Sequence, residues 1–257
     1  MSIYQYKQKQ YSDQTNQQRR PNSFIKIFDF IIIVGIISTI IYFMFFSDVF
    51  TINKVKVSGL ADSDKKNVQK EIELQVIDKN IFLLKSVKLK IELLEQYSNI
   101  KNVYINKNLP SILNVSFEER QNVFCWLYGE DYYLVDNSGI VYEHTQEKCE
   151  PILEIDSDGG YVKKPQIKTK YFDAREIDFI KNLNKELSQN KEIEFEKFIF
   201  REAAYEIIVN TPNYNIIFNT AREFGEQYKS LNSILPKVKK QVKEYIDLRV
   251  PGKVFYR

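Results

Sequence analysis

The sequence predicts an α+β protein with three parts: an N-terminal transmembrane helix, a small module of order β-α-α-β-β, and a mixed α/β domain whose mostly antiparallel sheet ends in an edge strand. Three observations favour this class: a long uncharged segment near the N-terminus, short runs of alternating apolar residues, and amphipathic helical segments between them. The 257 residues are 44% hydrophobic and 28% charged, as in a folded protein. The net charge of +3 gives no sign of nucleic-acid binding.

The uncharged segment runs over residues 30–46, with the sequence FIIIVGIISTIIYFMFF. As a helix it reaches roughly 26 Å, close to the thickness of a bilayer's hydrocarbon core. It is longer than the apolar region of a secretory signal peptide, and no pair of small residues follows it for cleavage. A buried core helix is rarely apolar on every side. We therefore expect a transmembrane helix over residues 25–47.

Charged residues on either side of this helix predict its orientation. The basic residues before it are Lys7, Lys9, Arg19, Arg20 and Lys26. The first charged residue after it is Asp48. The positive-inside rule then places the N-terminus in the cytoplasm, as in a single-pass type II protein, and the bulk of the chain outside it. Residues 1–24 are rich in Gln, Ser and Asn, which predicts a disordered cytoplasmic tail.

Residues 48–119 show the order β-α-α-β-β. A strand is predicted at residues 54–57 and a helix from about Ser63, and the inward face of this helix carries Val68, Ile72 and Val76. A second helix is expected over residues 86–97, with an inward face made of Val87, Ile91 and Leu94. Two strands flank the turn Asn-Leu-Pro-Ser, and the second of them alternates Leu113, Val115 and Phe117 with polar residues.

Residues 120–257 are predicted to form the C-terminal β domain. Hairpin strands are expected at residues 122–128, 131–136 and 139–144, and further strands at 195–202, 205–210 and 214–219. A flexible loop is expected around Gly159 and Gly160. One helix, over residues 173–188, buries Ile177, Ile180, Leu183 and Leu187. Another, over residues 226–244, turns Leu231, Leu235, Val238 and Val242 inward and bends at Pro236. A closing strand ends the chain.

No set of residues typical of catalysis, metal binding or cofactor binding is visible. The sole histidine, His144, ends a hairpin strand without a second ligand at metal-binding spacing. Glu118 and Glu119 are adjacent on a strand, so their side chains diverge and cannot act together as acid and base. We therefore expect no enzyme activity, no cofactor, no small-molecule substrate and no nucleic-acid partner.

Two cysteines, Cys125 and Cys149, lie in the part expected outside the cytoplasm. In an oxidising compartment they can pair, closing a loop of about 25 residues and stabilising the fold by roughly 3 kcal/mol. The alternative is two unrelated buried thiols, and the sequence leaves both open.

Several motifs in this order resemble the FtsQ/DivIB family of bacterial cell-division proteins. They are INKVKVSGL directly after the membrane helix, NIFLL, IKNVYINKNLPSILNVSFEER, YYLVDNSGIVY and the closing YIDLRVPGKVFYR. The resemblance covers nearly the whole chain, and it implies that residues 48–119 are a POTRA domain.

This resemblance implies a scaffold at the division septum of the inner membrane. Such a scaffold binds the single-span coiled-coil proteins FtsB (or DivIC) and FtsL outside the cytoplasm, and helps to regulate septal peptidoglycan synthesis through the synthase complex. An incoming strand would pair with the unpaired closing edge. Phe255 and Tyr256 would anchor it, and Arg249 would pair with an acidic residue of the partner. The expected docking residues are Arg249, Val250, Gly252, Lys253, Val254, Phe255 and Tyr256.

An alternative from a different class is a membrane-anchored POTRA protein that acts as a chaperone-like module in export or envelope assembly. Such a protein would share the module at residues 48–119 but would not need the closing strand. The closing edge could also fold back into its own sheet, with Lys253 and Arg257 keeping it soluble.

Overall fold

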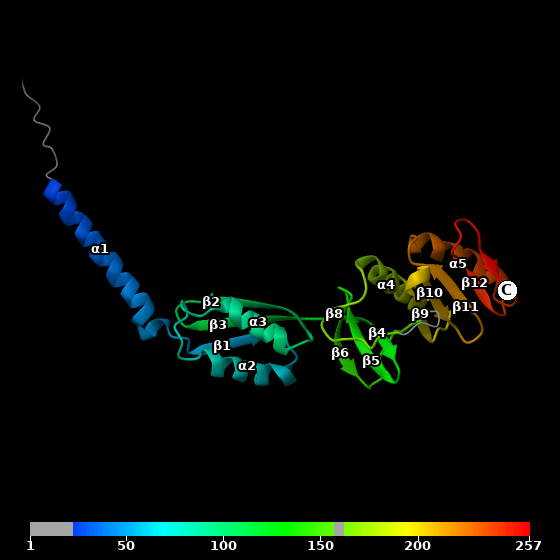
Figure 1. Cartoon of the computed structure of the whole chain (residues 1–257), viewed down its shortest axis with the longest axis horizontal. Coiled ribbons are helices and arrows are strands. Elements are labelled where there is room, and N and C mark those ends of the chain that lie inside the picture. The colour runs from blue at the N-terminus through cyan, green and yellow to red at the C-terminus, as the bar shows by residue number, and fades with distance from the viewer. Residues whose placement is uncertain (1–22, 157–161) are drawn as a thin grey trace, which may run out of the picture.

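A computed structural model describes residues 23–156 and 162–257, and it confirms the predicted α+β class. Figure 1 shows a helix, a first domain and a second domain following one another along the molecule. The predicted tail of residues 1–24 lies almost entirely outside the described residues, as do four of the five basic residues used for the orientation. The predicted loop at Gly159 and Gly160 lies outside them too.

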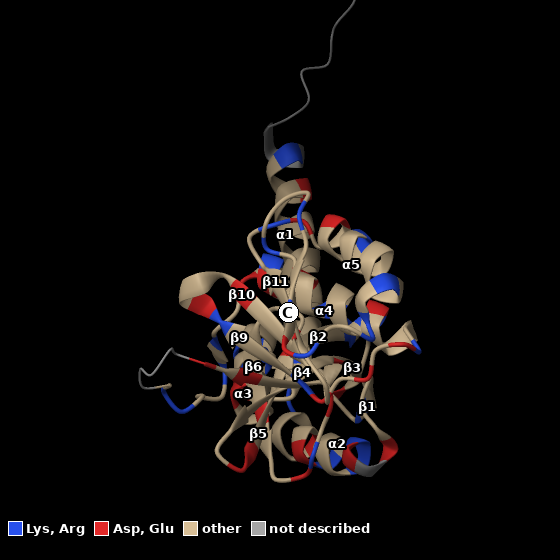
Figure 2. Ribbon diagram, turned by 90° about the vertical axis from the view of Figure 1, so that its right-hand side faces the viewer, with Lys and Arg blue, Asp and Glu red and all other residues tan. Residues whose placement is uncertain are grey.

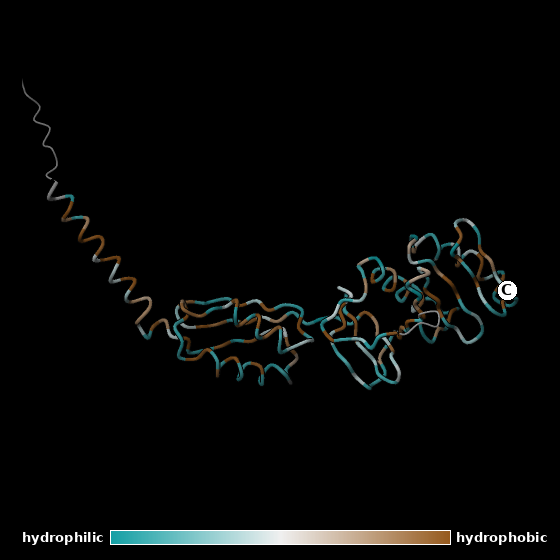
Figure 3. The backbone as a smooth tube through the Cα atoms, viewed as in Figure 1, coloured by the Kyte–Doolittle hydropathy of each residue, from teal (hydrophilic) through white to brown (hydrophobic). Residues whose placement is uncertain are grey.

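The N-terminal helix α1 (Ser23–Phe46) is apolar, and it is not buried in the protein over Lys26–Phe46. Its segment Lys26–Phe46 has the length and composition to cross a membrane, and none of it is buried inside the protein. Figure 3 shows this helix as a nearly continuous hydrophobic segment. A helix that is apolar on every side and contacts the rest of the described protein only at its last turn needs a lipid environment. These properties fit a single-pass membrane anchor.

The first domain has the predicted order β-α-α-β-β. Its three-stranded sheet has the order β1-β3-β2, with β1 parallel and β2 antiparallel to the central β3. The elements are β1 (Lys54–Ser58), α2 (Asp62–Val76), α3 (Ser86–Gln96), β2 (Ile100–Asn108) and β3 (Ile112–Glu119). A short 3-10 turn, Asp48–Phe50, links α1 to this domain. The predicted inward residues of α2 and β3 are all buried in one core.

The inward face predicted for α3 was wrong for Val87 and Ile91, whereas Leu94 does pack against the core. The buried residues of α3 are Leu89 and Leu93, whereas Val87 is 73% exposed and Ile91 50% exposed. Both pairs are spaced four residues apart, so helical periodicity alone fits either face. The helix buries its leucines and leaves Val87 and Ile91 on the surface.

The second domain is built on a ten-stranded sheet of order β13-β12-β11-β10-β9-β7-β4-β5-β6-β8. Neighbouring strands are antiparallel except in the pairs β4–β7, β7–β9 and β11–β12. The helices are α4 (Ala174–Gln189) and α5 (Phe224–Val238). The strands are β4 (Asn122–Tyr128), β5 (Asp131–Asp136), β6 (Ile140–Thr145), β7 (Ile152–Ile155), β8 (Thr169–Lys170), β9 (Lys197–Arg201), β10 (Glu206–Asn210), β11 (Asn215–Asn219), β12 (Tyr245–Asp247) and β13 (Phe255–Tyr256).

Helices α4 and α5 bury the residues that their periodicity predicts. The core contains all four predicted residues of each helical stripe, and the ring of Phe179 on α4 lies 5.4 Å from that of Phe224 on α5. Asp173 and Glu176 form a capping box that fixes the start of α4. Helix α5 ends at Val238, although the sequence predicted that it continues to residue 244.

Two strands were not predicted. Strand β8 adds a short edge to β6. Strand β7 lies between β4 and β9 and pairs in parallel with both, so it joins the two halves of the sheet. Cys125 on β4 and Cys149, just before β7, form a disulfide with their Cα atoms 6.0 Å apart. This bond closes the segment that contains β5 and β6, and it stabilises the domain by roughly 3 kcal/mol.

A buried ion pair joins the two domains. Arg120, which follows β3, pairs through its guanidinium with Asp136, whose side chain is 0% exposed. The Asp136 Oδ1 atom also accepts backbone hydrogen bonds from Ser138 (2.8 Å) and Ile140 (3.0 Å). Arg120 Nε donates to the carbonyl oxygen of Ser98, 3.2 Å away in the first domain. One carboxylate thus holds both the β5–β6 turn and the junction.

Gly139 in the β5–β6 turn provides a stability prediction. It has a φ of +78°, and an added Cβ would lie 2.0 Å from the carbonyl oxygen of Phe172. Gly129 has a similar φ of +65° but nothing within 4 Å, so it is a matched control. Gly129→Ala should cost about 1 kcal/mol for the positive φ, and Gly139→Ala at least about 2 kcal/mol more because of the overlap.

Urea unfolding, followed by the fluorescence of the single tryptophan, measures both variants. That residue, Trp126, is 3% exposed in the second domain. Equal losses of stability in the two variants would contradict the close packing at Gly139.

Candidate partner-binding edge

The ten-stranded sheet ends in β13, which has β12 as its one neighbour among the described strands. Asp247 lies opposite Phe255, and Ile246 lies opposite Tyr256. The Arg257 N–H donates to the carbonyl oxygen of Tyr245 at 3.1 Å. Backbone groups alternate in direction along an antiparallel strand, so the N–H and C=O of Tyr256 point away from β12. This edge therefore presents backbone groups to an incoming strand.

Apolar side chains flank the same edge. Phe255 is 48% exposed, Tyr256 is 44% exposed and Val250 is 41% exposed. Val254, between them, packs against the domain core. The edge thus combines unpaired backbone groups with two half-exposed aromatic rings, the residue type that most often anchors protein interfaces.

The predicted closing strand is interrupted. The sequence placed a continuous docking edge over residues 250–256, but β13 contains only Phe255 and Tyr256. Lys253 N donates to the carbonyl oxygen of Val250 at 3.2 Å, and Gly252 has a φ of +68°. Pro251 followed by Gly252 at positive φ is the chemistry of a type II turn, so the chain reverses here instead of continuing as a strand. Val250 and Gly252 therefore lie in a turn.

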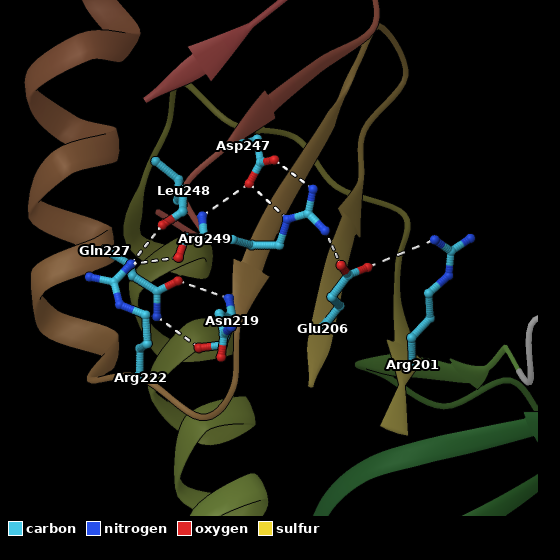
Figure 4. A network of polar contacts seen from close by, with 8 residues as sticks. All are labelled: Arg201, Glu206, Asn219, Arg222, Gln227, Asp247, Leu248 and Arg249. Carbon is cyan, nitrogen blue, oxygen red and sulfur yellow. Dashed lines mark hydrogen bonds and ion pairs between the residues drawn. The ribbon is translucent and has the colours of Figure 1, made fainter. Parts of the chain in front are cut away.

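Arg249 is held inside the domain instead of awaiting a partner (Figure 4). Its Nε lies 2.9 Å from Asp247 Oδ1, and one terminal nitrogen lies 2.6 Å from Asp247 Oδ2. The other terminal nitrogen pairs with Glu206 on β10. Glu206 also faces Arg201 on β9, at 3.8 Å. The prediction that Arg249 pairs with an acidic residue of a partner is therefore replaced by an internal pairing with Asp247 and Glu206.

Arg222 secures the start of the same hairpin, and Gln227 holds the neighbouring end of β11. Arg222 donates to the carbonyl oxygens of Leu248 (3.0 Å) and Arg249 (3.1 Å). Gln227 on α5 accepts from the backbone N–H of Asn219 and donates to its carbonyl oxygen, at 2.8 and 2.9 Å. Sequence reasoning missed this network. A usable signal was the spacing of Asp247 and Arg249, because residues two apart in extended chain share one face.

Asp247 is ionised more readily than a free aspartate. Burial opposes its charge, but the hydrogen bonds from the side chain and backbone of Arg249 outweigh that effect and lower the pKa of Asp247 below its usual value. The same hydrogen bonds to Asp247, together with those to Glu206, raise the pKa of Arg249 above its usual value. Both groups are therefore charged at neutral pH, and their pairing holds the hairpin.

The other residues singled out from the sequence lie in ordinary surface contacts. His144 lies 3.2 Å from Asp131, and Glu118 lies 2.7 Å from Lys101. Among the described residues, no three His, Cys, Asp or Glu side chains are grouped closely enough to hold a metal ion. Figure 2 shows basic and acidic residues interspersed on α2 and α5.

Comparisons with known proteins match the first domain and about half of the chain. Residues 50–120 match the family described as POTRA domain, FtsQ-type. The chain is also 29% identical over 135 residues to the cell division protein DivIB of Clostridium acetobutylicum, a match that covers 52% of this chain and 53% of that protein. The chain thus matches about half the length of this relative. These similarities confirm the predicted resemblance to the FtsQ/DivIB family.

Replacing Asp247 with Asn should make the second domain less stable in a pH-dependent way. At neutral pH we expect a loss of about 1–3 kcal/mol, because Arg249 keeps its charge and loses its main partner. The greater stability of the wild type is present above the pKa of Asp247 in the unfolded chain, about 3.9. It is lost as the pH falls through the lower pKa that Asp247 has in the folded protein. The two proteins should therefore converge in stability under acid conditions.

Unfolding of both proteins between neutral pH and about pH 3, monitored by Trp126, measures this difference. Asp178→Asn, a change at an exposed residue of α4, is the control and should differ little from wild type at any pH. A difference between wild type and Asp247→Asn that does not change with pH would show that the charge of Asp247 does not hold the hairpin.

Proposed function

We propose that this chain is a non-enzymatic scaffold of the cell-division machinery that binds its partner by strand addition along β13. The observation that carries the proposal is that the backbone N–H and C=O of Tyr256 face away from β12. The half-exposed rings of Phe255 and Tyr256 lie beside these groups. An exposed edge of this kind promotes aggregation unless it is short or covered. Its presence in a chain similar to a division protein favours a dedicated partner.

The proposed partners are single-span coiled-coil proteins of the FtsB/DivIC and FtsL kinds. A partner strand antiparallel or parallel to β13 would extend the sheet, with backbone hydrogen bonds giving affinity and side-chain contacts giving selectivity. Lys253 is exposed and forms no ion pair with the described residues, whereas the exposed Arg257 side chain lies 3.4 Å from Glu244 in an ion pair. Because Arg249 and Arg257 are both paired within the domain, Lys253 is the cation of the closing segment that can attract an acidic residue beside the partner strand.

The hairpin is already ordered before binding. Asp247, Glu206 and Arg222 all contact the Arg249 side chain or its backbone. A partner therefore does not have to order this loop, which reduces the entropic cost of association. The network supports the site without touching the partner.

We place the N-terminus in the cytoplasm, α1 in the inner membrane and both folded domains outside it, at the septum. The basic residues before α1 support this orientation through the positive-inside rule. From this position the scaffold would act on septal peptidoglycan synthesis indirectly, through the coiled-coil proteins that it binds.

Two substitutions test the backbone part and the side-chain part of the proposed contact separately. Tyr256→Pro removes an outward N–H that β12 does not use, while Phe255→Glu places a charge beside the partner strand. Each should weaken capture of the coiled-coil partner by the full-length chain at least roughly tenfold, since an edge open to strand pairing is replaced by a blocked or charged one. Binding is measured with both proteins in one membrane or detergent preparation.

Ile167→Glu is the matched control, because Ile167 is 44% exposed in the same domain away from β13. It should bind as wild type does. Capture by the Phe255→Glu and Tyr256→Pro variants equal to that of Ile167→Glu would refute docking at this edge. A tagged chain spread evenly over the envelope, instead of gathered at midcell, would refute the division role itself.

A further inference from the structure

The end of the POTRA domain next to α1 is joined to the last turn of that helix. Asn80 Nδ2 donates to the carbonyl oxygens of Met44 (2.8 Å) and Phe45 (3.2 Å). The ring of Phe82 lies 6.4 Å from that of Phe45 and 5.1 Å from that of Phe50. Figure 1 shows α1 meeting the POTRA domain at the end opposite the second domain. If α1 spans a bilayer, the residues around Asn80 lie at its surface.

Exposed apolar side chains gather at this end. Leu83 is 62% exposed, Val87 is 73% exposed, and Leu109 in the β2–β3 turn is 58% exposed. A groove of about 630 Å³ runs between the end of α2 and the start of α3. Its lining includes Leu74, Leu83, Leu84, Lys79, Lys85 and the ion-paired Lys88 and Glu92. A second hollow of about 740 Å³ adjoins it and is lined by Val87, Ile91 and Lys107 among others.

Lysines accompany these apolar residues. Lys79 and Lys85 are exposed and form no ion pair with the described residues. Lys107 donates to the carbonyl oxygen of Leu84 at 2.8 Å, which keeps its ammonium beside the groove. Asp48 and Asp78 also lie at this end, so the surface is mixed but basic within the groove. Exposed leucines flanked by lysines suit the boundary between lipid tails and anionic headgroups.

We propose that this α1-proximal surface, made by residues 79–91 and the turn at Leu109, binds anionic phospholipids of the bilayer that α1 crosses. Lys79 and Lys85 contact lipid phosphates, and Leu83 and Leu109 enter the interface. The bilayer is the occupant favoured by position, because the surface continues directly from a membrane helix and α1 keeps it at high effective concentration near the lipid. The inference requires that α1 spans a membrane and does not depend on docking at β13.

Lipid contact is measured on the full-length chain in vesicles. The two native cysteines are joined in a disulfide, so a Leu83→Cys or Leu109→Cys variant offers one thiol for a bimane label. The vesicles contain phosphatidylglycerol with brominated acyl chains, which quench only a nearby fluorophore. We expect roughly twofold lower fluorescence at residues 83 and 109. The control Ile167→Cys, at an exposed position in the second domain, should show no quenching.

The charge dependence separates binding from tethering by α1. Quenching should fall when brominated phosphatidylcholine replaces phosphatidylglycerol, when salt is raised, and in a Lys79→Gln, Lys85→Gln variant. Quenching at residue 83 no greater than at residue 167 overturns the proposal. Quenching that is insensitive to lipid charge and to the two lysines also overturns it, because tethering alone then accounts for the proximity. Quenching that appears only with a co-reconstituted partner protein would mean that this surface docks protein instead.

Discussion

The arrangement of the two folded domains depends on how the buried carboxylate of Asp136 is satisfied. A carboxylate taken out of water without partners is destabilised by several kcal/mol. Here Arg120 neutralises it, and two backbone N–H groups of the β5–β6 turn donate to it. Arg120 directly follows the last strand of the POTRA domain and also binds the carbonyl oxygen of Ser98. One charge pair therefore specifies the turn of the second domain and the position of the first domain against it.

The same solution recurs at the far end of the sheet. Asp247 and Glu206 come from β12 and β10, and Arg249 joins them across the sheet. The cluster fixes the hairpin, and the turn at Pro251 and Gly252 leaves β13 only two residues long. A short edge limits aggregation, and a rigid one still offers ordered backbone groups. The residues that stabilise the hairpin thus also keep the backbone of β13 accessible for pairing.

Sequence periodicity and turn residues predicted those parts of the fold that depend on neighbouring residues. The stripes on α2, α4 and α5, the hairpin strands and the first-domain order all follow from periodicity and turn chemistry. The buried face of α3 could not be predicted in this way. The pairs Val87/Ile91 and Leu89/Leu93 have the same spacing, and only tertiary packing selects Leu89 and Leu93.

Strand β7 could not be predicted either, since it is short and its partners in parallel pairing are distant in sequence. At the candidate site the aromatic edge was visible in the sequence. The internal role of Arg249 was hidden because Glu206 lies far from it along the chain.

The contacts at the two junctions make the distance from α1 to β13 a property of the fold. α1 is bonded to the POTRA domain through Asn80, and the POTRA domain is bonded to the second domain through Arg120. On the proposed function, the partner is held by its own helix in the same membrane. Its docking strand must then lie at the matching distance from that helix, and a wrong spacing prevents docking whatever the strand's sequence. On the same proposal, anchoring in one bilayer raises the effective concentration of the partner, which would let an edge of two residues with two aromatic anchors capture it selectively.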